Sequence, residues 1–143
     1  MTVLAKDHHL ILLAHGSSDS NWTGTLEHGL SRINDFLSKK AAIAYLEKAT
    51  PSLDAVISKS CLQGNKVFDV LPLFFAEGRH LLHDVPEIIV RLSEQYPDIT
   101  INLLPAIGCQ DVFWEALGIM IRSEYDNRQS APHDHREASG YTH

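Results

Sequence analysis

The stretch Leu10-Ile11-Leu12-Leu13-Ala14 decides the fold class, because an unbroken apolar run is typical of a strand that is covered on both faces. Such a strand belongs to a parallel sheet with helices packed on each side. A second short apolar run, at residues 41–46, indicates another buried strand. Between the two runs, apolar residues recur at helical spacing, at Leu26, Leu30, Ile33 and Leu37.

The alternation of strand and helix continues along the chain. Thr50-Pro51 predicts the start of a second helix, with Thr50 as its N-cap and Pro51 at the first helical position. Gly64 stands where that helix is expected to end. The remaining elements are expected as a strand at 67–75, a helix from Asp84 to before Pro97, a strand at 99–104 and a helix at 112–121.

Four strand–helix units in series predict an α/β fold, a single flavodoxin-like domain with a four-stranded parallel sheet flanked by helices. We expect this domain to span residues 1–126. Residues 127–143 lack hydrophobic periodicity and large aliphatic side chains, which predicts a disordered tail. For its histidines, weak metal binding and plain disorder are the two interpretations; they are His133, His135 and His143.

Composition excludes several classes of function. The 143 residues contain 12 Lys and Arg against 18 Asp and Glu, a formal net charge of −6, which argues against nucleic-acid binding. Cys61 and Cys109 have no spacing typical of a zinc knuckle or a disulfide framework. No apolar run approaches the ~20 residues needed to cross a bilayer, and residues 1–6 are too short and polar for a signal peptide. We therefore expect a soluble cytoplasmic protein.

Polar residues follow three of the expected strands. His15 comes after the first strand, Glu47 after the second, and a loop at residues 76–84 that contains His80 after the third. Ligands of open parallel sheets bind outside the carboxyl ends of the strands, so these side chains can meet at one site. Imidazole and carboxylate suit iron, cobalt, nickel or zinc. Three protein ligands leave coordination positions open, as in reactive rather than structural metal sites.

Each of these residues also has a structural interpretation. A histidine at a strand end can simply cap the core, and Glu47 can be an exposed carboxylate that favours the dipole of the following helix. Gly16 and Gly78 can serve turns that need positive φ. Two further residues of the third loop, Arg79 and His83, can be solvated. His83 is alternatively a secondary metal contact, and we assign no role to His8, His9 or His28.

The sequence after the first strand does not fit two other enzyme classes or a nucleotide-binding site. A histidine phosphatase has Arg directly before its His-Gly, where this chain has Ala14. A serine hydrolase needs G-x-S-x-G at the strand–helix turn, and the sequence after the first strand is His-Gly-Ser-Ser-Asp. A nucleotide site needs a Gly-rich signature that the sequence lacks.

Four stretches carry a resemblance to a known family: ILLAHGSSD (residues 11–19), AYLEKATPSL (44–53), VLPLFFAEGRHLLHDVP (70–86) and LLPAIG (103–108). In order and register they resemble the class II tetrapyrrole chelatases, and most nearly the small sirohydrochlorin cobaltochelatases and ferrochelatases of the CbiX/SirB type. The likeness spans about residues 10–122. His-Gly-Ser and Gly-x-His-x-x-x-Asp-x-Pro together are fairly specific to that family, and either alone is weak.

The resemblance implies insertion of a divalent metal, cobalt, iron or nickel, into sirohydrochlorin, on the route to sirohaem or cobalamin. The metal is then a substrate, and no tightly bound cofactor is expected. The family's metal-handling histidines fall on His15 and His80 and its acidic residue on Glu47, so these three are the expected catalytic and metal-binding residues. Longer relatives contain two such units that face each other across a cleft, and short ones are expected to pair as homodimers.

One position departs from the family pattern. Members often have Arg after His-Gly-Ser, where this chain has Ser18. Sirohydrochlorin carries many carboxylates and this chain is acidic, so the groups that bind the substrate's carboxylates must be local to the site. We expect this binding from Arg79, from Gly78 in the same loop, from backbone N–H groups around Gly16-Ser17-Ser18 and from helix N-termini.

Two questions stay open at this point. Phe74 and Phe75 either line a flat substrate cavity or belong to the core. The alternative to an enzyme is a metal-binding or metal-delivery protein on the same fold, which keeps His15 and His80 but turns nothing over.

Overall fold

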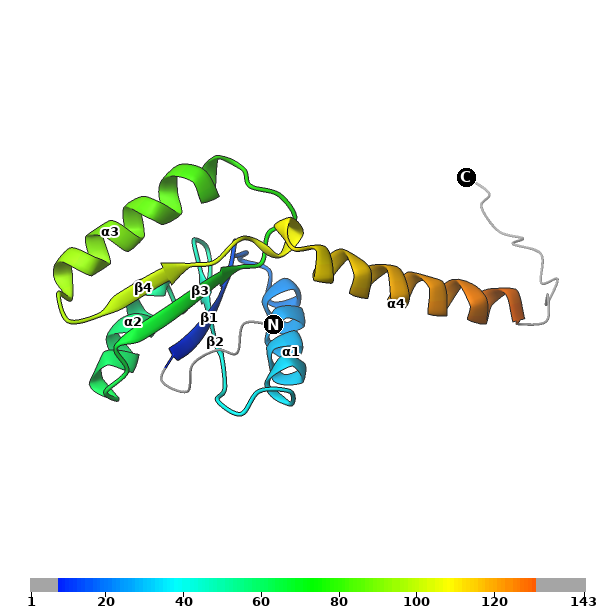
Figure 1. Cartoon of the computed structure of the whole chain (residues 1–143), viewed down its shortest axis with the longest axis horizontal. Helices are drawn as coiled ribbons and strands as arrows, with labels where there is room; N and C mark the ends of the chain where they lie inside the picture. The colour runs from blue at the N-terminus through cyan, green and yellow to red at the C-terminus, as the bar shows by residue number, and fades with distance from the viewer. Residues whose placement is uncertain (1–7, 131–143) are drawn as a thin grey trace, which may run out of the picture. The chain divides into compact units, whose positions relative to one another are not determined.

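The computed structural model describes residues 8–130 of the 143-residue chain. Its strands are β1 (His8–Ala14), β2 (Ala42–Tyr45), β3 (Val67–Pro72) and β4 (Thr100–Leu103). The helices, drawn in Figure 1, are α1 (Ser20–Asn34), α2 (Leu53–Leu62), α3 (Val85–Gln95) and α4 (Asp111–Ser130), with a π-helical turn η1 (His80–Asp84) and a 3-10 turn η2 (Ile107–Cys109).

The strands form one parallel sheet in the order β2-β1-β3-β4. This arrangement confirms the predicted flavodoxin-like α/β fold. The chain first adds β2 on one side of β1 and then places β3 on the other, so the strand order reverses between β1 and β3. Open α/β sheets bind their ligands outside the carboxyl ends of the strands at such a point. The loops that follow β1, β2 and β3 are therefore the place to look for a site.

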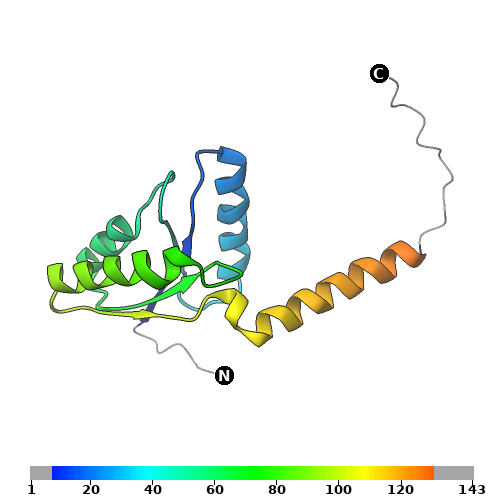
Figure 2. The same ribbon diagram turned by 90° about the horizontal axis from the view of Figure 1, so that it is seen from above.

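Helices cover the sheet on both faces, as Figure 2 shows for α1 on one side and α2 with α3 on the other. The core between the sheet and α2 and α3 includes fully buried side chains from the strands and from both helices, among them Ile11, Phe68, Val70, Ile57 and Leu92. A smaller core packs Leu26 and Leu30 of α1 against buried side chains of β1 and β2, which are Ala14, Ile43 and Tyr45. The two cores explain why the Leu10–Ala14 run contains no polar residue.

The predicted start of α2 is wrong. Ser52, not Thr50, is the N-cap: its hydroxyl accepts a hydrogen bond from the Ala55 N–H at 3.2 Å. Pro51 stays outside the helix because its carbonyl accepts the N–H of Tyr45 at 2.9 Å, which extends the pairing of β2. The predicted end is confirmed, since Gly64 has φ +87° and closes the helix with a 3.0 Å hydrogen bond from its N–H to the Cys61 carbonyl.

The third helix begins where predicted, at Asp84 and Val85, but a π-helical turn that the sequence did not predict precedes it. Asp84 has helical backbone angles and makes no capping hydrogen bond through its side chain, because the chain is already wound into η1 from His80 onward. Pro86 lies in the first turn of α3, where a residue without an N–H is tolerated. Helical backbone therefore runs from His80, a predicted site residue, through η1 and into α3.

The last helix is longer than predicted. α4 runs to Ser130, so residues 127–130 of the expected tail are helical, and residues 131–143, with His133, His135 and His143, lie outside the described residues. The chain divides into two compact units, Met1–Gln110 and Asp111–His143, so the boundary expected after residue 126 falls within α4. No helix in residues 8–130 combines the length and the apolar character that crossing a bilayer requires.

A polar contact crosses one face of the sheet far from the strand exits. Asp69 in β3 is only 4% exposed. One of its carboxylate oxygens is 2.7 Å from Nδ1 of His8, and the other accepts a hydrogen bond from Asn102 at 2.8 Å. The buried carboxylate is thus satisfied by side chains from β1 and β4, which gives His8 a structural role.

Candidate functional site

His15 and Glu47 lie side by side at the carboxyl edge of the sheet. His15 directly follows β1 and Glu47 lies two residues beyond β2. His15 Nε2 is 3.1 Å from Glu47 Oε1, and the two side chains are 43% and 48% exposed. The Glu47 N–H donates to the His15 carbonyl at 3.0 Å, which continues the pairing of the two chain segments beyond the ends of β1 and β2. The structure therefore brings together two of the three predicted ligands, on adjacent strand ends and open to solvent.

Gly16 allows this close approach. Its φ is +107°, and a Cβ atom at this position would lie 1.7 Å from the Glu47 carbonyl oxygen. No residue with a side chain fits there without moving the backbone that carries Glu47. The backbone role weighed for Gly16 is therefore confirmed, while contact of Gly16 with substrate stays a prediction.

The residues after Gly16 build the start of α1. Asp19 is the N-cap and its carboxylate accepts the Asn21 N–H at 2.8 Å, while the Asp19 N–H donates to the Ser17 hydroxyl at 3.0 Å. Asp19 thus has a structural reason to be here, and Ser17 supports it. Ser18 is exposed between them. The first turn of α1 is thus capped from within the chain, because the Asp19 carboxylate takes the Asn21 N–H and the Asp19 carbonyl takes the Thr23 N–H. The helix N-terminus expected to contact the substrate is therefore already occupied by a carboxylate.

The third loop lies beyond β3. Arg79 and Gly78 are exposed, as is His83 on η1, and a Cβ atom at Gly78 would meet no atom within 4 Å. Positive φ among the described glycines occurs at Gly16 and Gly64, so the turn role considered for Gly78 is wrong. His80 opens η1, and its side chain lies outside what the structure describes. Its convergence with His15 on one ion stays a prediction.

The two phenylalanines of this loop differ. Phe74 packs against the larger core and also meets the His15 ring edge-on, with ring centroids 6.3 Å apart and an angle of 65° between the planes. Phe75 is 66% exposed and does not belong to the core. Phe74 therefore links the core to a predicted ligand, and Phe75 presents an apolar ring at the same edge of the sheet.

Among the side chains that the structure describes, no group of three or more His, Cys, Asp or Glu residues is placed to hold a metal ion. His15 with Glu47 is a pair, and His80, whose side chain the structure does not describe, stays the predicted third ligand. An imidazole and a carboxylate can bind an ion in an open and exchangeable way or exchange a proton between them.

Two features of this edge were missed in the sequence. Lys48, directly after Glu47, is exposed and has φ +57°, which is uncommon for a residue with a side chain. The Cys109 thiol is exposed and lies near the Glu77 carboxylate. Partial desolvation, followed by the charge of Glu77 and its capacity to accept a hydrogen bond, raises the pKa of this thiol, so it stays protonated at neutral pH. The lysine beside Glu47 was a visible signal for an anionic ligand, whereas nothing in the sequence pairs residues 77 and 109.

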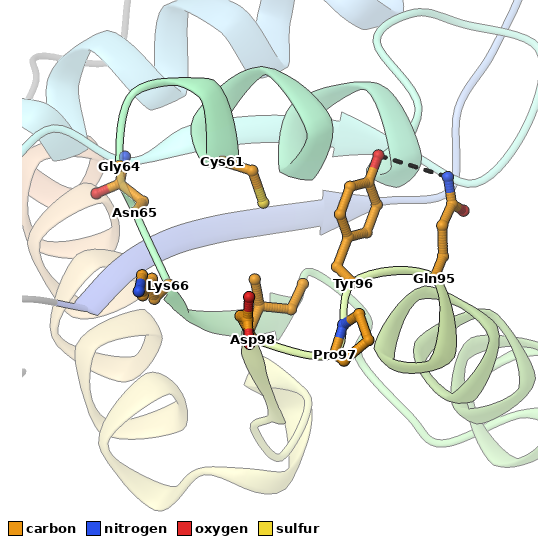
Figure 3. A pocket seen from close by; sticks show the side chains of 9 residues that line it. Cys61, Gly64, Asn65, Lys66, Gln95, Tyr96, Pro97 and Asp98 are labelled. Atoms are coloured by element: carbon orange, nitrogen blue, oxygen red, sulfur yellow. Dashed lines mark hydrogen bonds between the residues drawn. The ribbon is translucent and has the colours of Figure 1, made fainter.

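Two cavities lie at opposite edges of the sheet. One of about 320 Å³ is near the third loop and is lined by Glu77, Leu81, Leu82, Pro86 and residues 103–105. The other, of about 280 Å³, is drawn in Figure 3 and lies where β3 and β4 begin, among side chains that include Cys61, Lys66 and Tyr96. It contains none of the predicted site residues. Burial raises the pKa of Cys61, so this thiol behaves as an apolar lining group.

The fold and the strand exits together define a class: a parallel α/β protein with an open histidine–carboxylate pair at the carboxyl edge of its sheet. The family model of CbiX matches residues 9–124, and the chain belongs to the CbiX family. A crystal structure described as a putative cobalamin (vitamin B12) biosynthesis CbiX protein from Marinobacter aquaeolei is 41% identical, with a TM-score of 0.76. That match covers 84% of this chain and 98% of the other.

Two curated relatives are chelatases. The sirohydrochlorin ferrochelatase of Bacillus subtilis is 32% identical over 69 residues, which is 48% of this chain and only 26% of that protein. The sirohydrochlorin cobaltochelatase of Saccharolobus solfataricus is 24% identical over 126 residues, 82% of this chain and 95% of that protein. The structure of the Bacillus subtilis SirB chelatase in complex with cobalt shares the fold, with a TM-score of 0.71 at 24% identity. This chain spans half of that one.

Proposed function

We propose that this protein is a sirohydrochlorin chelatase that inserts cobalt(II) or iron(II) into the macrocycle, on the route to cobalamin or sirohaem. The observation that carries the proposal is the 3.1 Å contact between His15 Nε2 and Glu47 Oε1 at the carboxyl edge of the sheet. Membership of the CbiX family supports it, as do the chelatase names of its relatives. The metal is a substrate of this reaction.

The chemistry needs a weak and reversible hold on the metal. Neutral imidazole binds cobalt or iron near pH 7 and releases it again, whereas thiolates would retain it. His15 and His80 are the proposed metal-handling histidines. Glu47 completes the ligand set or accepts one of the two pyrrole protons that the metal replaces. Its half-exposed carboxylate is open to solvent, which gives that proton a way out.

The substrate's carboxylates need local positive charge, because the chain as a whole carries a formal charge of −6. Arg79 and Lys48 are exposed cations on two of the loops at this edge. The backbone N–H groups around Gly16-Ser17-Ser18 are proposed to contact the same carboxylates, whereas the first turn of α1 is already capped by the Asp19 carboxylate. These groups are the proposed substrate contacts in a chain that has Ser18 where the family often has Arg.

We further propose that the chain acts as a homodimer in the cytoplasm. The site of one chain has a pair of ligands and an open side, while this chain spans half of the SirB chain whose fold it shares. A second copy closes the open side over a flat macrocycle in the simplest way, by a two-fold axis.

The test is an insertion assay. Purified protein is mixed with sirohydrochlorin and cobalt(II), iron(II) or nickel(II) in parallel, and the visible absorption bands of the macrocycle are followed. We expect the bands to shift faster than without protein for at least one metal. If the metal binds while the bands move at the uncatalysed rate, the protein is a metal-delivery protein and the enzyme proposal is wrong.

A further inference from the structure

The loop that leads to His80 is pressed against a second loop, the one that follows β4. The Gly108 N–H donates to the Phe74 carbonyl at 3.0 Å. A Cβ atom at Gly108 would lie 1.6 Å from the Phe75 carbonyl oxygen, 2.2 Å from its carbonyl carbon and 2.5 Å from its Cα. All three atoms belong to the backbone, so no rotation of a side chain can make room. Position 108 therefore accepts only glycine while this loop keeps its path.

The next residue holds the same loop a little further along. The Cys109 thiol lies near the carboxylate of Glu77, two residues beyond Phe75, close enough for the two groups to interact. The raised pKa of the thiol keeps its proton in place as the donor at neutral pH. η2, which contains both Gly108 and Cys109, thus contacts the loop at Phe74, at Phe75 and at Glu77.

Two residues, Gly78 and Arg79, separate Glu77 from His80, the first residue of η1. The other end of the loop is anchored as well, because the Leu82 N–H donates to the Gly78 carbonyl at 3.1 Å and Leu81 is buried in the core. Few backbone torsions are therefore free to change between the contacts at Phe74, Phe75 and Glu77 and the contacts at Leu81 and Leu82. A shift at Phe75 passes directly to Gly78 and Arg79.

We propose that Gly108, with Cys109, is a positioning residue for the chelatase reaction. The close approach of η2 fixes the conformation of residues 74–79 and so sets where Arg79 and His80 stand relative to the His15–Glu47 pair. Neither Gly108 nor Cys109 touches substrate in this scheme. The inference rests on the proposed chelatase function for its effect on rate, but not for its effect on the loop.

The test compares Gly108→Ala with Gly64→Ala. Gly64 also lies in a loop, but at the opposite edge of the sheet, and a Cβ atom there meets nothing within 4 Å. We expect Gly108→Ala to lower kcat for metal insertion roughly tenfold to hundredfold, with a smaller change in KM, because the groups on the loop are misplaced. Hydrogen exchange at residues 74–82 should become faster. Gly64→Ala should lose thermal stability but keep kcat and the exchange rates of that segment.

Cys109 supplies a second and milder pair of variants in case Gly108→Ala does not fold. Cys109→Ala removes the donor and should lower kcat by roughly threefold or more, whereas Cys109→Ser keeps a donor and should restore most of it. Exchange in residues 74–82 should follow the same order.

Two results overturn the inference. One is wild-type exchange of residues 74–82 in both Gly108→Ala and Cys109→Ala. The other is wild-type kcat in these variants of an active enzyme. If the wild-type protein inserts no metal, the proposed function fails, and the exchange rates alone decide whether η2 positions the loop.

Discussion

The two halves of the sheet's carboxyl edge use the same device and differ in what it holds. In the β1–β2 half, Gly16 lies so near the Glu47 backbone that an added Cβ atom would be 1.7 Å from the Glu47 carbonyl oxygen. In the β3–β4 half, a Cβ atom added at Gly108 would be 1.6 Å from the Phe75 carbonyl oxygen. A missing side chain permits one loop to press on another in each case. The first contact fixes the neighbouring residues His15 and Glu47. The second fixes the loop that leads to His80.

The difference shows how directly each half depends on the strands. His15 and Glu47 stand within two residues of strand ends, so the hydrogen bonds that extend the sheet also align them. His80 is eight residues past β3, and its position depends on a loop held by η2. We infer that the strands themselves hold His15 and Glu47 in place, which makes the β1–β2 half the rigid half. The position of His80 depends in addition on residues of η2 that do not contact the substrate.

The largest effect is expected from removing a metal-handling imidazole. His80→Ala should lower insertion by roughly 10²-fold or more with the fold intact, and His15→Ala should do likewise. The insertion assay measures the rate, and circular dichroism checks the fold. His83→Ala on the same turn is the matched control and should change the rate little. A fully active His80→Ala protein would remove that residue from the mechanism.

The next effect tests the rigid half through its backbone. Gly16→Ala combines two costs, the left-handed φ of +107° and the collision with the Glu47 carbonyl oxygen. Gly64→Ala has only the first, with φ +87° and open space around the new methyl group. Left-handed strain alone costs about 1–3 kcal/mol, so Gly16→Ala should lose more stability than Gly64→Ala in denaturant unfolding. It should also weaken cobalt(II) binding, which Gly64→Ala should not. Equal losses in both variants would contradict the close approach.

The same difference explains how much the sequence could predict. The strands, their parallel arrangement and the residues at their exits follow from apolar runs such as Leu10–Ala14, because burial on both faces excludes polar residues. His15 and Glu47 could be assigned to the same edge of the sheet from their places after two strands, but the sequence did not predict that these strands are neighbours. The start of α2 could not be predicted, because the Pro51 carbonyl is taken by Tyr45, a contact between residues six apart that no helix rule contains.

The second half was less predictable for a physical reason. Its organisation depends on contacts between residues 74–77 and 108–109, more than thirty positions apart, and these contacts leave no periodic pattern. The sequence showed a conspicuous glycine within LLPAIG, but a glycine alone does not reveal which backbone approaches it. The left-handed backbone at Lys48 was hidden in the same way, since lysine has no preference for positive φ.

A moderate effect is expected at Lys48, which adds charge to the rigid half. Lys48→Gly removes the cation and accepts φ +57° without strain, so folding should be kept. We expect KM for sirohydrochlorin to rise about two- to fivefold, the range of an exposed ion pair, and the difference to shrink at high salt. Lys66→Gly, at the opposite edge of the sheet, is the charge-matched control. A KM that responds equally to both changes would mean that only net charge matters.

The smallest effect tests the contact between Cys109 and Glu77 in the other half. Because the pKa of Cys109 is raised by partial desolvation and by Glu77, its alkylation should accelerate at higher pH than that of an ordinary thiol. Glu77→Gln removes the negative charge that disfavours the thiolate, so the midpoint of the rate–pH profile should move down. The measurement needs a Cys61→Ser background, because Cys61 is the other thiol of the chain. Glu87→Gln on α3 changes net charge equally and should leave the midpoint in place. If Glu77→Gln also leaves it in place, Glu77 does not hold Cys109 in solution, and the β3–β4 half is fixed by Gly108 alone.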